Sequence, residues 1–595
     1  MCGITGYIGK KQALPIIFSN LKKLEYRGYD SAGVVFFNTT GKIEKIKAIG
    51  QLSNLEKKLK LSSSLPLTAA IGHTRWATHG VPNEINAHPH TDCRKEIFLV
   101  HNGIIENHKA LKAELQKLWH KFHSQTDTEV VPHLIEEYGF EKMLKKISGA
   151  YAFAAVFKKE PNKLYFARLG SPLVVGIGED GHYLASDPTA LAGLVKKVIY
   201  LKDGQRGVLS LDAMAIGPAR PKIEPLDIDP EQAKKGKFAH FMLKEIFEGP
   251  EVIRAALRGR LLPDRGLVKL GGLENAAAKI FGIKKLDIIA CGTSYYAGLV
   301  GKMFFEELAG IPAEVHLASE YRYREIPKQK NAAAIFISQS GETADTLAAL
   351  HKVKKEKRVC LGIVNSVGSS IARETDFGVY NHAGPEIGVA STKAFLSQLT
   401  VMVLQALYFR QGKKKLDKKF MRELADLPKK IETILQQNDQ IKKLAKKYSH
   451  YDNFSYLGRG YNYPTALEGA LKLKEISYIH AEGYAGGEMK HGPIALIDGN
   501  FPTVALANQN HLYEKMISNL EEIKSRGGKI IAVATAGDKM IGQLADDVIY
   551  LPATLPQFEP IINVVPLQLF AYHVAVTRGC DVDKPRNLAK SVTVE

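Results

Sequence analysis

The second half of the chain contains an internal repeat, which restricts the possible folds more than any other feature of the sequence. AIFISQSGETADTLAAL aligns with VALANQNHLYEKMISNL, and DFGVY aligns with DDVIY. Gln339 and Gln509 are 170 residues apart, as are Tyr380 and Tyr550. LDIIACGTS and FSYLGRG also match, at a slightly shorter offset. Each copy alternates buried strand, polar loop and helix, which predicts two tandem α/β units with parallel sheets.

The first half has a different pattern. Short β-type runs such as SAGVVFF, EIFLVHNG and SGAYAFAAVF come in groups, with helical patterns at LPIIFSNLKKLEY and HKALKAELQKLWHKF. This grouping predicts stacked antiparallel sheets flanked by helices. KGKFAHFMLKEIFEGPEVIRAAL predicts a helical connector. The expected parts are an N-terminal domain at 2–225, a linker at 226–250, α/β domains at 275–420 and 446–580, and a tail at 581–595.

Composition narrows the classes of partner and compartment. The net charge of +19 comes from lysine runs such as KKVKKEKR, which are mixed with acids and helix formers. Solvated helix faces explain these runs better than a nucleic-acid site. The cysteines are odd in number, scattered and without a CxxC pair, so we expect a reducing cytoplasm, no disulfide framework and no thiolate zinc site. AFLSQLTVMVLQALYF is too short and too polar to span a bilayer, and predicts a buried helix.

Two hydroxyl-rich loops follow buried strands in the first copy of the repeat. Strand AAAIFI leads into SQSGET at 338–343, and strand IIA leads into CGTS at 291–294. One such loop is ordinarily a helix N-cap, but two at equivalent strand ends favour a phosphate site. The second copy has NQNH at 508–511 instead, so we expect one phosphate site, in the first copy.

A helix predicted around ALEGALKLKEIS carries Glu468, Lys472 and Glu475 within one sector of about 60°. A solvated salt-bridge face is the ordinary interpretation of such a pattern. However, this helix follows a strand and loop where a cleft is expected, and His491 lies on a nearby Gly-flanked loop. Two acids, a lysine and a histidine near a phosphosugar would suit proton transfer. Lys590 lies in the polar tail, where spacing alone does not distinguish it from a solvated lysine.

The chain begins MCGITGYIGK, with a cysteine directly after the initiator methionine. No apolar segment precedes it, so we expect neither a signal peptide nor a lipidated cysteine. If Met1 is removed, Cys2 carries both a thiol and an α-amine of pKa about 7.7–8.0, which can serve as a base for the thiol.

The N-terminal half also offers groups that could hold an amino acid. Asn102 and Gly103, at the predicted end of strand IFLV, have the ingredients of an oxyanion hole. Arg75 could bind a carboxylate and Asp127 an ammonium group. The GxGxxG at 176–181 lies between strands and predicts a hairpin turn rather than a nucleotide site. The histidine-rich segments contain His73, His79, His88, His90, His101 and His108. A metal site is one interpretation of these residues, although no HExxH motif supports it.

Together these motifs resemble the glutamine–fructose-6-phosphate aminotransferase (isomerizing) family over nearly the whole chain. LEYRGYDSAG, GHTRWATHG, NAHPH, HNGIIEN and SQTDTE are similar to a class II glutaminase of the N-terminal nucleophile type. The duplicated half resembles two sugar isomerase (SIS) domains. The resemblance implies an α/β protein, with an N-terminal αββα sandwich followed by two doubly wound SIS domains. The glutaminase motifs alone would also fit amidophosphoribosyltransferases and asparagine synthetases, which tandem SIS domains exclude.

The resemblance implies that L-glutamine and D-fructose 6-phosphate become L-glutamate and D-glucosamine 6-phosphate, with ammonia channelled between two sites. This would be the first step of hexosamine synthesis, carried out by a cytoplasmic homodimer without cofactor or metal and without nucleic-acid or membrane partners. Two other functions would fit part of the chain. A sugar-phosphate sensor built on SIS domains leaves the glutaminase half unexplained. A glutaminase that feeds a separate acceptor enzyme leaves the phosphate loop unexplained.

The resemblance also assigns roles to residues that match the family motifs. Cys2 would be the nucleophile, with Asn102 and Gly103 as the oxyanion hole. In the isomerase, Lys590 would form a Schiff base, Glu475 would move a proton with Lys472 and Glu468 nearby, and His491 of the partner subunit would open the sugar ring. The implied glutamine-binding residues are Arg75, Trp76 (also a gate for ammonia), Thr78, His79, His88 and Asp127. The implied sugar-phosphate-binding residues are Cys291, Gly292, Thr293, Ser294, Ser338, Gln339, Ser340, Thr343, Val389 and Ala589.

Overall fold

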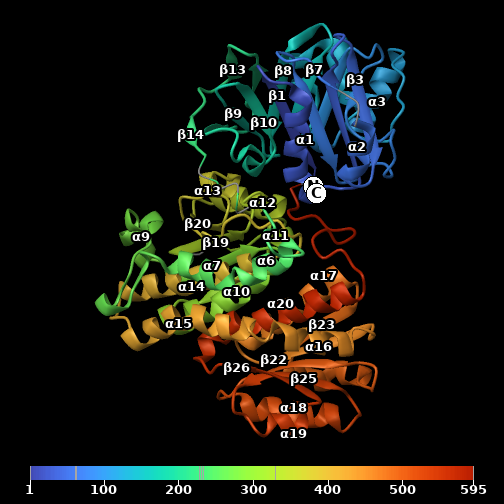
Figure 1. Ribbon diagram of the computed structural model, residues 1–595. Helices are drawn as coiled ribbons and strands as arrows, with labels where there is room; N and C mark the ends of the chain where they lie inside the picture. The colour runs from blue at the N-terminus through green and yellow to red at the C-terminus, as the bar shows by residue number, and fades with distance from the viewer. Residues whose placement is uncertain are drawn as a thin grey trace. The chain divides into compact units, whose positions relative to one another are not determined.

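The computed structural model describes residues 2–59, 63–226, 228, 231, 234–327 and 330–593. Met1, whose removal the sequence predicts, lies outside them. The chain divides into two compact units, which are described separately (Figure 1). The first comprises Met1–Lys234 with Ala589–Glu595, and the second comprises Lys235–Leu588.

The first unit contains two antiparallel sheets with helices on their outer faces (Figure 1). The first sheet consists, in spatial order, of β14 (Glu224–Pro225), β11 (Lys197–Tyr200), β9 (Val174–Ile177), β10 (Gly181–Ala185), β1 (Gly3–Gly9), β4 (Ala70–Arg75), β2 (Ser31–Phe37) and β3 (Ile43–Ile49). The second consists of β13 (Met214–Gly217), β12 (Arg206–Leu209), β8 (Glu160–Leu169), β7 (Gly149–Phe157), β6 (Ile97–Ile105) and β5 (His90–Thr91). The helices are α1 (Ala13–Leu24), α2 (Leu52–Leu59), α3 (His108–Lys117), α4 (Val130–Tyr138) and α5 (Phe140–Lys146).

Three apolar layers hold this unit together. One lies between α1, α2 and the first sheet, one between the two sheets, and one between the second sheet and helices α3–α5. Successive side chains of a strand point to opposite faces, so β1 directs Ile4 and Ile8 towards the second sheet and Tyr7 towards α1. The strand is therefore buried on both faces, and the predicted αββα sandwich is confirmed.

Two local predictions in this unit have different outcomes. The GxGxxG segment forms the turn between antiparallel strands β9 and β10, as expected. The predicted helix HKALKAELQKLWHKF is too long, because α3 ends at Lys117 and Trp119 has a left-handed backbone with φ 69°. The residues after Lys117 therefore form a loop instead of continuing the helix.

The second unit contains two five-stranded parallel sheets. In spatial order the first has β18 (Ala313–Leu317), β17 (Lys285–Ala290), β19 (Ala332–Ser338), β20 (Val359–Val364) and β21 (Phe377–Tyr380). The second has β23 (His480–Ala485), β22 (Asn453–Gly458), β24 (Thr503–Ala507), β25 (Ile530–Thr535) and β26 (Asp547–Leu551). Strands β19, β20 and β21 correspond to β24, β25 and β26, so the sheets follow the sequence repeat and the predicted duplication is confirmed.

Helices surround both sheets and connect the copies (Figure 1). The longer ones are α6 (Phe241–Phe247), α7 (Gly249–Leu257), α10 (Gly292–Phe304), α12 (Ala344–Lys355), α14 (Lys393–Gln411), α15 (Lys418–Leu435), α16 (Asn438–Tyr448), α17 (Asn462–Ser477), α18 (Tyr513–Lys524) and α20 (Glu559–Thr577). The shorter elements are β15 (Leu261–Leu262), β16 (Leu267–Val268), α8 (Gly271–Glu274), α9 (Ala277–Phe281), α11 (Ala318–Tyr321), α13 (Ser370–Glu374) and α19 (Ile541–Leu544). Helices α6 and α7, where the sequence predicts a helical connector, belong to the second unit, and Met242, Ile246 and Ile253 are buried in its core.

The core of the second unit is built from equivalent helices of the two copies. Helices α14 and α20 each have 19 residues and each follow the last strand of a copy. Helix α14 is almost wholly buried, as AFLSQLTVMVLQALYF predicts. Within the described residues, Pro556–Thr577 is long and apolar enough to cross a membrane by length and composition, but 89% of its apolar window is buried inside the protein. Helices α10 and α17, which follow the first strand of each copy, pack against one another.

Residues shortly after α20 are anchored to the second unit at two places. The Asp583 carboxylate accepts hydrogen bonds from the N–H groups of Phe241 and Met242, both at 2.9 Å, at the N-terminus of α6. Arg586 donates its N–H to the Tyr478 hydroxyl at 2.8 Å, and its guanidinium lies 4.1 Å from the centre of that ring. This part of the tail is therefore fixed as far as the C-terminal end of α17.

Candidate active sites

Cys2 immediately precedes β1, at the end of the strand that lies between β10 and β4. Its thiol accepts a hydrogen bond from the Trp76 N–H, with a nitrogen–sulfur distance of 3.3 Å. Burial raises the pKa of the Cys2 thiol. A buried thiol of this kind needs a base to become a nucleophile, and the α-amine exposed by loss of Met1 would be the nearest available one.

Asn102 presents its side-chain amide to the same place. Its Nδ2 donates to the carbonyl oxygen of Cys2 at 2.8 Å, and its Oδ1 lies 3.2 Å from Nε2 of His73. Nε2 of His73 also lies 3.0 Å from the His101 carbonyl, so this nitrogen carries the proton. Burial lowers the pKa of the His73 imidazole to about 3, which keeps the ring neutral. His73 therefore fixes the orientation of the Asn102 amide, a role that the sequence did not reveal.

Asn102 and Gly103 lie inside β6, which continues to Ile105, and not at the end of a strand as predicted. Gly103 has φ +135°, and a Cβ atom there would collide with the Ala150 carbonyl oxygen. This position therefore requires glycine. The backbone next to Asn102 is thus held in a conformation that other residues rarely adopt.

Arg75, the last residue of β4, is 3% exposed. Its Nη2 donates to the carbonyl oxygens of His79 at 2.5 Å and Gly80 at 3.0 Å. Its Nη1 is buried and has no hydrogen-bond partner among the described residues. A buried guanidinium with one donor unused is suited to bind a carboxylate.

Asp127 is 3% exposed and accepts a hydrogen bond from the Ile105 N–H at 2.7 Å. This contact places the carboxylate beside the strand that carries Asn102. Its other oxygen accepts only a long contact of 3.5 Å from the Thr128 hydroxyl, and a carboxylate oxygen has lone pairs to receive an ammonium group as well. Asp127, Asn102 and Arg75 therefore offer complementary groups to the two ends of an amino acid.

The other predicted glutamine-binding residues lie around this site in different states of exposure. Trp76 is partly buried and packs edge-on against Tyr29 with ring centres 6.1 Å apart. Thr78 and His79 are adjacent on the loop after β4, with Oγ1 and Nδ1 3.4 Å apart. His88 is buried and stacks on His73 at 4.1 Å. The His88 ring therefore packs against the His73 ring, which orients Asn102.

The two hydroxyl-rich loops of the second unit lie at neighbouring strand ends. Strands β17 and β19 are parallel neighbours, so 291–294 and 338–343 follow the same edge of the sheet. Ser338 Oγ and Thr343 Oγ1 are 2.8 Å apart, Ser338 Oγ accepts the Gly341 N–H at 3.0 Å, and Ser340 Oγ accepts the Glu342 N–H at 3.2 Å. The loop is thus preformed, with hydroxyls gathered at the N-terminus of α12, as a phosphate site requires.

The remaining predicted phosphate residues divide into two groups. Ser294 Oγ accepts a hydrogen bond at 2.9 Å from Nε2 of Gln398, a polar side chain inside the apolar helix α14. Cys291 and Gly292 begin α10, and Gln339 follows β19. Val389 is buried in the segment before α14, and its N–H donates to the Asp583 carbonyl at 3.1 Å. The sequence analysis did not single out Gln398 as a neighbour of the candidate residue Ser294, although a glutamine in a buried helix is itself a signal.

Glu468, Lys472 and Glu475 come together with Thr293 at the contact between α10 and α17. Lys472 Nζ lies 2.6 Å from Glu475 Oε2, 3.4 Å from Glu468 Oε1 and 3.1 Å from Thr293 Oγ1. Thr293 in turn donates to Glu468 at 3.1 Å. Glu468 and Lys472 are both 0% exposed, so the ordinary interpretation of a solvated salt-bridge face is wrong.

The electrostatics of this cluster follow from its burial. Burial raises the pKa of the Glu468 carboxyl to about 7. Burial alone would lower the pKa of the Lys472 ammonium, but the two adjacent carboxylates outweigh it and raise that pKa. Lys472 therefore remains a cation and holds Glu475 in a fixed orientation.

In the second copy, asparagine and glutamate side chains lie at the strand ends that correspond to the hydroxyl-rich loops of the first copy. Asn462 donates to Asn508 at 3.2 Å and to Glu559 at 2.7 Å, and Asn563 donates to Asn508 at 2.7 Å. These groups are buried. Asn508 takes the place that Ser338 has in the first copy. The space that holds hydroxyls in one copy therefore holds a closed amide network in the other.

Three predicted residues lie outside these two clusters. His491 ends the short 3-10 helix η6 (Gly486–His491) and is exposed. Ala589 and Lys590 follow the last residue of the second unit and group with the first. Their placement against the cluster on α17 stays a prediction.

Comparisons with known proteins identify the family of each half of the chain. The SIS domain family matches residues 279–408 and 448–578, and the glutamine amidotransferase domain family matches residues 62–206. The chain is 49% identical to the glutamine–fructose-6-phosphate aminotransferase (isomerizing) of Chlorobaculum tepidum over 616 residues, and 45% identical to that of Methanosarcina acetivorans over 622 residues, with 100% of both chains covered in each case. The C-terminal domain of glucosamine-fructose-6-phosphate aminotransferase from Francisella tularensis matches with a TM-score of 0.56 and 41% identity, covering 59% of this chain and 100% of that one.

Lys472→Met is expected to lower the thermal unfolding temperature of the chain by roughly 5 °C or more, because breaking a buried ion pair from one side costs about 3–5 kcal/mol. Lys474→Met is the matched control, since Lys474 lies on the same helix but is exposed. Scanning calorimetry of both variants beside the unaltered chain makes the comparison. Equal unfolding temperatures for the two variants would contradict the buried charge cluster.

Proposed function

The chain belongs to the glutamine–fructose-6-phosphate aminotransferase (isomerizing) family, and we propose that its first unit releases ammonia from L-glutamine while its second unit converts D-fructose 6-phosphate to D-glucosamine 6-phosphate. The observation that carries the proposal is the hydrogen bonding of Thr293 to both Glu468 and Lys472. It joins the loop suited to a phosphate to groups suited to proton transfer within one unit, as a phosphosugar isomerase requires.

The proposed glutaminase step uses the cluster around Cys2. The Cys2 sulfur attacks the side-chain amide carbon of glutamine, and the α-amine takes the thiol proton and passes it to the departing ammonia. Asn102 and Gly103 stabilise the negative oxygen of the tetrahedral intermediate. Water then hydrolyses the thioester to give glutamate. Arg75 and Asp127 hold the α-carboxylate and α-amine, which Thr78, His79 and His88 surround, and Trp76 gates the ammonia that passes to the second site.

The proposed isomerase step uses the cluster on α17. Ser294, Ser338, Gln339, Ser340 and Thr343 bind the phosphate, with Cys291, Gly292, Val389 and Ala589 completing the site. Lys590 forms an imine with C2 of the open-chain sugar, and ammonia displaces the lysine to leave an imine of the sugar. Glu475, held by Lys472, then moves a proton from C1 to C2 to give the amino sugar.

Two observations support the role of Lys590. Arg586 is held against Tyr478 at the end of α17, three residues after Glu475. Lys590 is four residues beyond Arg586, and four residues span at most about 14 Å. The tail is therefore anchored at the end of the helix that carries Glu475 only four residues before Lys590, which supports the proposed role of this lysine.

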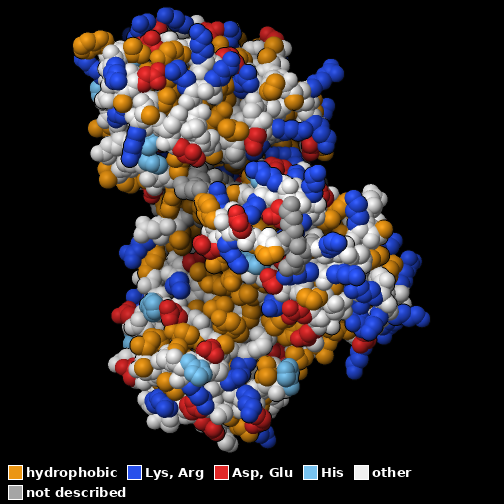
Figure 2. Space-filling view, turned by 180° about the vertical axis from the view of Figure 1, so that it is seen from behind, with side chains coloured by type: hydrophobic (Ala, Val, Ile, Leu, Met, Phe, Trp, Pro, Cys, Tyr) orange, Lys and Arg blue, Asp and Glu red, His pale blue; other side chains and the backbone are white. Residues whose placement is uncertain are grey.

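The enzyme is proposed to be a cytoplasmic homodimer in which His491 of the partner subunit opens the sugar ring. The exposure of His491 supports this, because it leaves the imidazole available to a second chain. Hydrophobic side chains also gather on the face of the second unit seen in Figure 2, as on surfaces that a partner covers. Lys and Arg side chains in that view are scattered among acidic ones, which supports solvated faces rather than a nucleic-acid site.

Cys2→Ala is expected to abolish glutamine-dependent synthesis and to spare conversion of fructose 6-phosphate to glucose 6-phosphate, because the two chemistries lie in different units. Both activities are assayed on the same preparation. Cys580→Ala, which removes a partly buried thiol in the second unit, should keep both. A preparation that retains Met1 by intact mass should also fail with glutamine. Loss of isomerisation in a folded Cys2→Ala protein would refute the division of labour.

Replacing Ser338, Ser340 and Thr343 together by Ala is expected to raise the Michaelis constant for fructose 6-phosphate by more than about a hundredfold, since each hydrogen bond to a charged group contributes about 1.5–3 kcal/mol. Basal glutaminase activity should persist. The repeat supplies a matched pair, in which Gln339→Ala should weaken sugar binding and Gln509→Ala should not. An unchanged Michaelis constant in the triple variant would place the phosphate elsewhere.

Borohydride reduction in the presence of fructose 6-phosphate is expected to fix a sugar adduct on Lys590, because an imine is reducible to a stable amine. Peptide mass mapping locates the adduct. Lys590→Arg keeps the charge but cannot form an imine, so it should lose synthesis while glutaminase activity continues. Lys584→Arg in the same tail is the control. An adduct on Lys472, or an active Lys590→Arg enzyme, would show that the tail has another role.

A further inference from the structure

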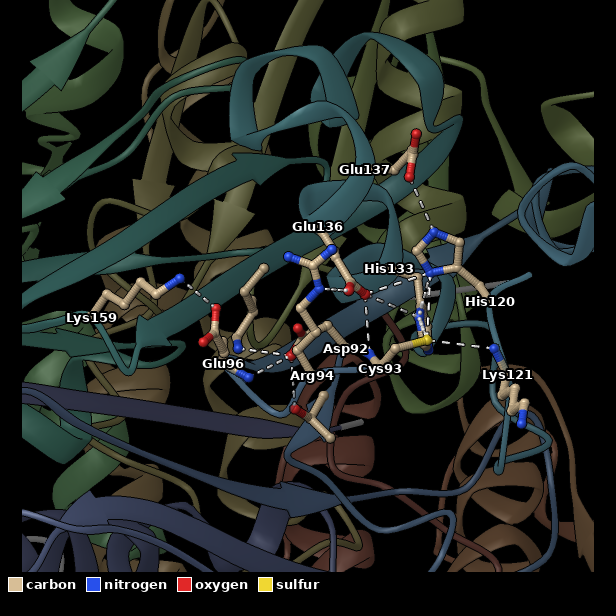
Figure 3. Close-up of polar contacts among 12 residues, drawn as sticks. Asp92, Cys93, Arg94, Glu96, His120, Lys121, His133, Glu136, Glu137 and Lys159 are labelled. Atoms are coloured by element: carbon tan, nitrogen blue, oxygen red, sulfur yellow. Dashed lines mark hydrogen bonds and ion pairs between the residues drawn. The ribbon is translucent and has the colours of Figure 1, made fainter. Parts of the chain in front are cut away.

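The first unit contains a second cluster, in which each side chain offers an atom that can bind a metal: Cys93, His120, His133 and Glu136 (Figure 3). Three separate segments supply it. Cys93 lies in the turn between β5 and β6, and His120 lies in the stretch after α3. His133 and Glu136 are three residues apart on α4, so they share one face of that helix. We call these four residues the Cys-His cluster.

The four side chains of the Cys-His cluster direct their ligand atoms at one point. Cys93 Sγ lies 3.6 Å from His120 Nδ1 and 3.4 Å from His133 Nδ1. The two Nδ1 atoms are 3.1 Å apart, and Glu136 Oε2 lies 3.5 Å from that of His120 and 3.9 Å from that of His133. Three of these five distances match, and the other two lie within about 0.3 Å of, the spacing in tetrahedral zinc, whose bonds of about 2.0–2.3 Å set ligand atoms about 3.3–3.6 Å apart.

From this geometry we propose that the Cys-His cluster binds one Zn²⁺ ion with four protein ligands, as a structural site. Sulfur, two imidazole nitrogens and a carboxylate oxygen form a mixed set that suits zinc and not the oxygen-seeking Mg²⁺ or Ca²⁺. Binding replaces the thiol proton of Cys93, which passes to solvent, by a sulfur–zinc bond. Four protein ligands leave no position for a substrate, so the ion would have no direct part in chemistry.

Hydrogen bonds alone explain this arrangement less well. Two imidazole nitrogens facing one another can share a single proton, and the Glu136 carboxylate oxygen only accepts. The Cys93 N–H donates to Glu136 Oε2 at 3.1 Å, but the lone pairs of the sulfur and of the two imidazole nitrogens still crowd one small volume, and a cation at the common centre would satisfy them.

Neighbouring groups hold the four side chains in place, as outer contacts do around protein-bound metals. Glu137 Oε2 lies 3.4 Å from Nε2 of His120, which directs Nδ1 of that ring towards the cluster. Arg94 Nε pairs with the other oxygen of Glu136 at 3.1 Å. The Lys121 N–H donates to the Cys93 sulfur at 3.5 Å, a contact that stabilises a thiolate. Figure 3 shows these partners arranged around the cluster.

An ion has a route to the Cys-His cluster. Cys93 is exposed, and both Cys93 and His133 line a cavity of about 740 Å³. The opposite side of the cluster is buried, since His133 is 1% exposed. A metal can therefore enter from solvent and be held against the interior.

The position of the Cys-His cluster suggests what the ion would do. His120 precedes Asp127 by seven residues and His133 follows it by six, so ligands lie on both sides of the loop that carries this carboxylate. Within that loop the N–H groups of His123 and Ser124 donate to Glu129 at 2.9 and 2.6 Å. A shared ion would fix both ends of the loop to the β5–β6 turn. This second step rests on the proposed function, in which Asp127 binds the glutamine amine.

The test begins with the full chain freed of metal by a chelator and supplied with Zn²⁺ or Co²⁺. Mass spectrometry of metals is expected to find about one zinc ion per chain, and Co²⁺ should give the visible absorption of a tetrahedral site together with a thiolate-to-cobalt charge-transfer band. Cys93→Ser should remove the charge-transfer band, and His120→Gln should weaken zinc binding at least tenfold. Cys580→Ser and His450→Gln, which lie outside the cluster, should change neither measurement.

The results test two claims separately: that the Cys-His cluster binds zinc, and that the bound zinc braces the loop that carries Asp127. A metal-free chain that takes up neither ion, or a charge-transfer band that survives Cys93→Ser, would overturn the zinc site whatever the enzyme does. Removal of zinc is expected to raise the Michaelis constant for glutamine severalfold and to leave fructose 6-phosphate isomerisation unchanged. If zinc binds as described while that constant stays the same, the bracing of the Asp127 loop is wrong and the metal site stands.

Discussion

The buried ammonium of Lys472 is the interaction on which the second unit depends. A cation with no access to water is stable only when opposite charge and hydrogen bonds surround it. Glu468 and Glu475 supply the charge from the same helix, and Thr293 supplies a hydroxyl from the other copy of the repeat. The same contact therefore fixes α10 against α17, orients Glu475, and ties the phosphate loop to the proton-transfer groups. Stability and chemistry in this unit rest on a single arrangement.

The two copies of the repeat share one fold but carry different side chains at their strand ends. Both copies have the same strand order, and both end in a buried 19-residue helix. Ser338 in one copy corresponds to Asn508 in the other. Hydroxyls gather at the N-terminus of α12 in the first copy, whereas Asn508 of the second copy is hydrogen-bonded to Asn462 and Asn563. Under the proposed function the first copy binds the phosphate, and the second contributes the helix that carries Lys472.

The sequence predicted most of the fold, because repeated strands and alternating hydrophobic residues directly reflect which faces are buried. It could not show that Glu468 and Lys472 are inaccessible, since their helix looks amphipathic until α10 and α20 cover it. It placed Asn102 at the end of a strand, because only pairing with β7 reveals that β6 continues. The Cys-His cluster was equally invisible: Cys93 is 27 and 40 residues from its two histidines, and α3 had to end before His120 for them to meet.

A crystal structure of the chain with fructose 6-phosphate bound tests the central claim most directly. The account predicts the phosphate within hydrogen-bond distance of Ser338, Ser340 and Thr343, with C1 and C2 of the sugar beside Glu475 and Lys472 still paired with that carboxylate. A phosphate beside Asn508, or a carbon chain directed away from Glu475, would contradict it.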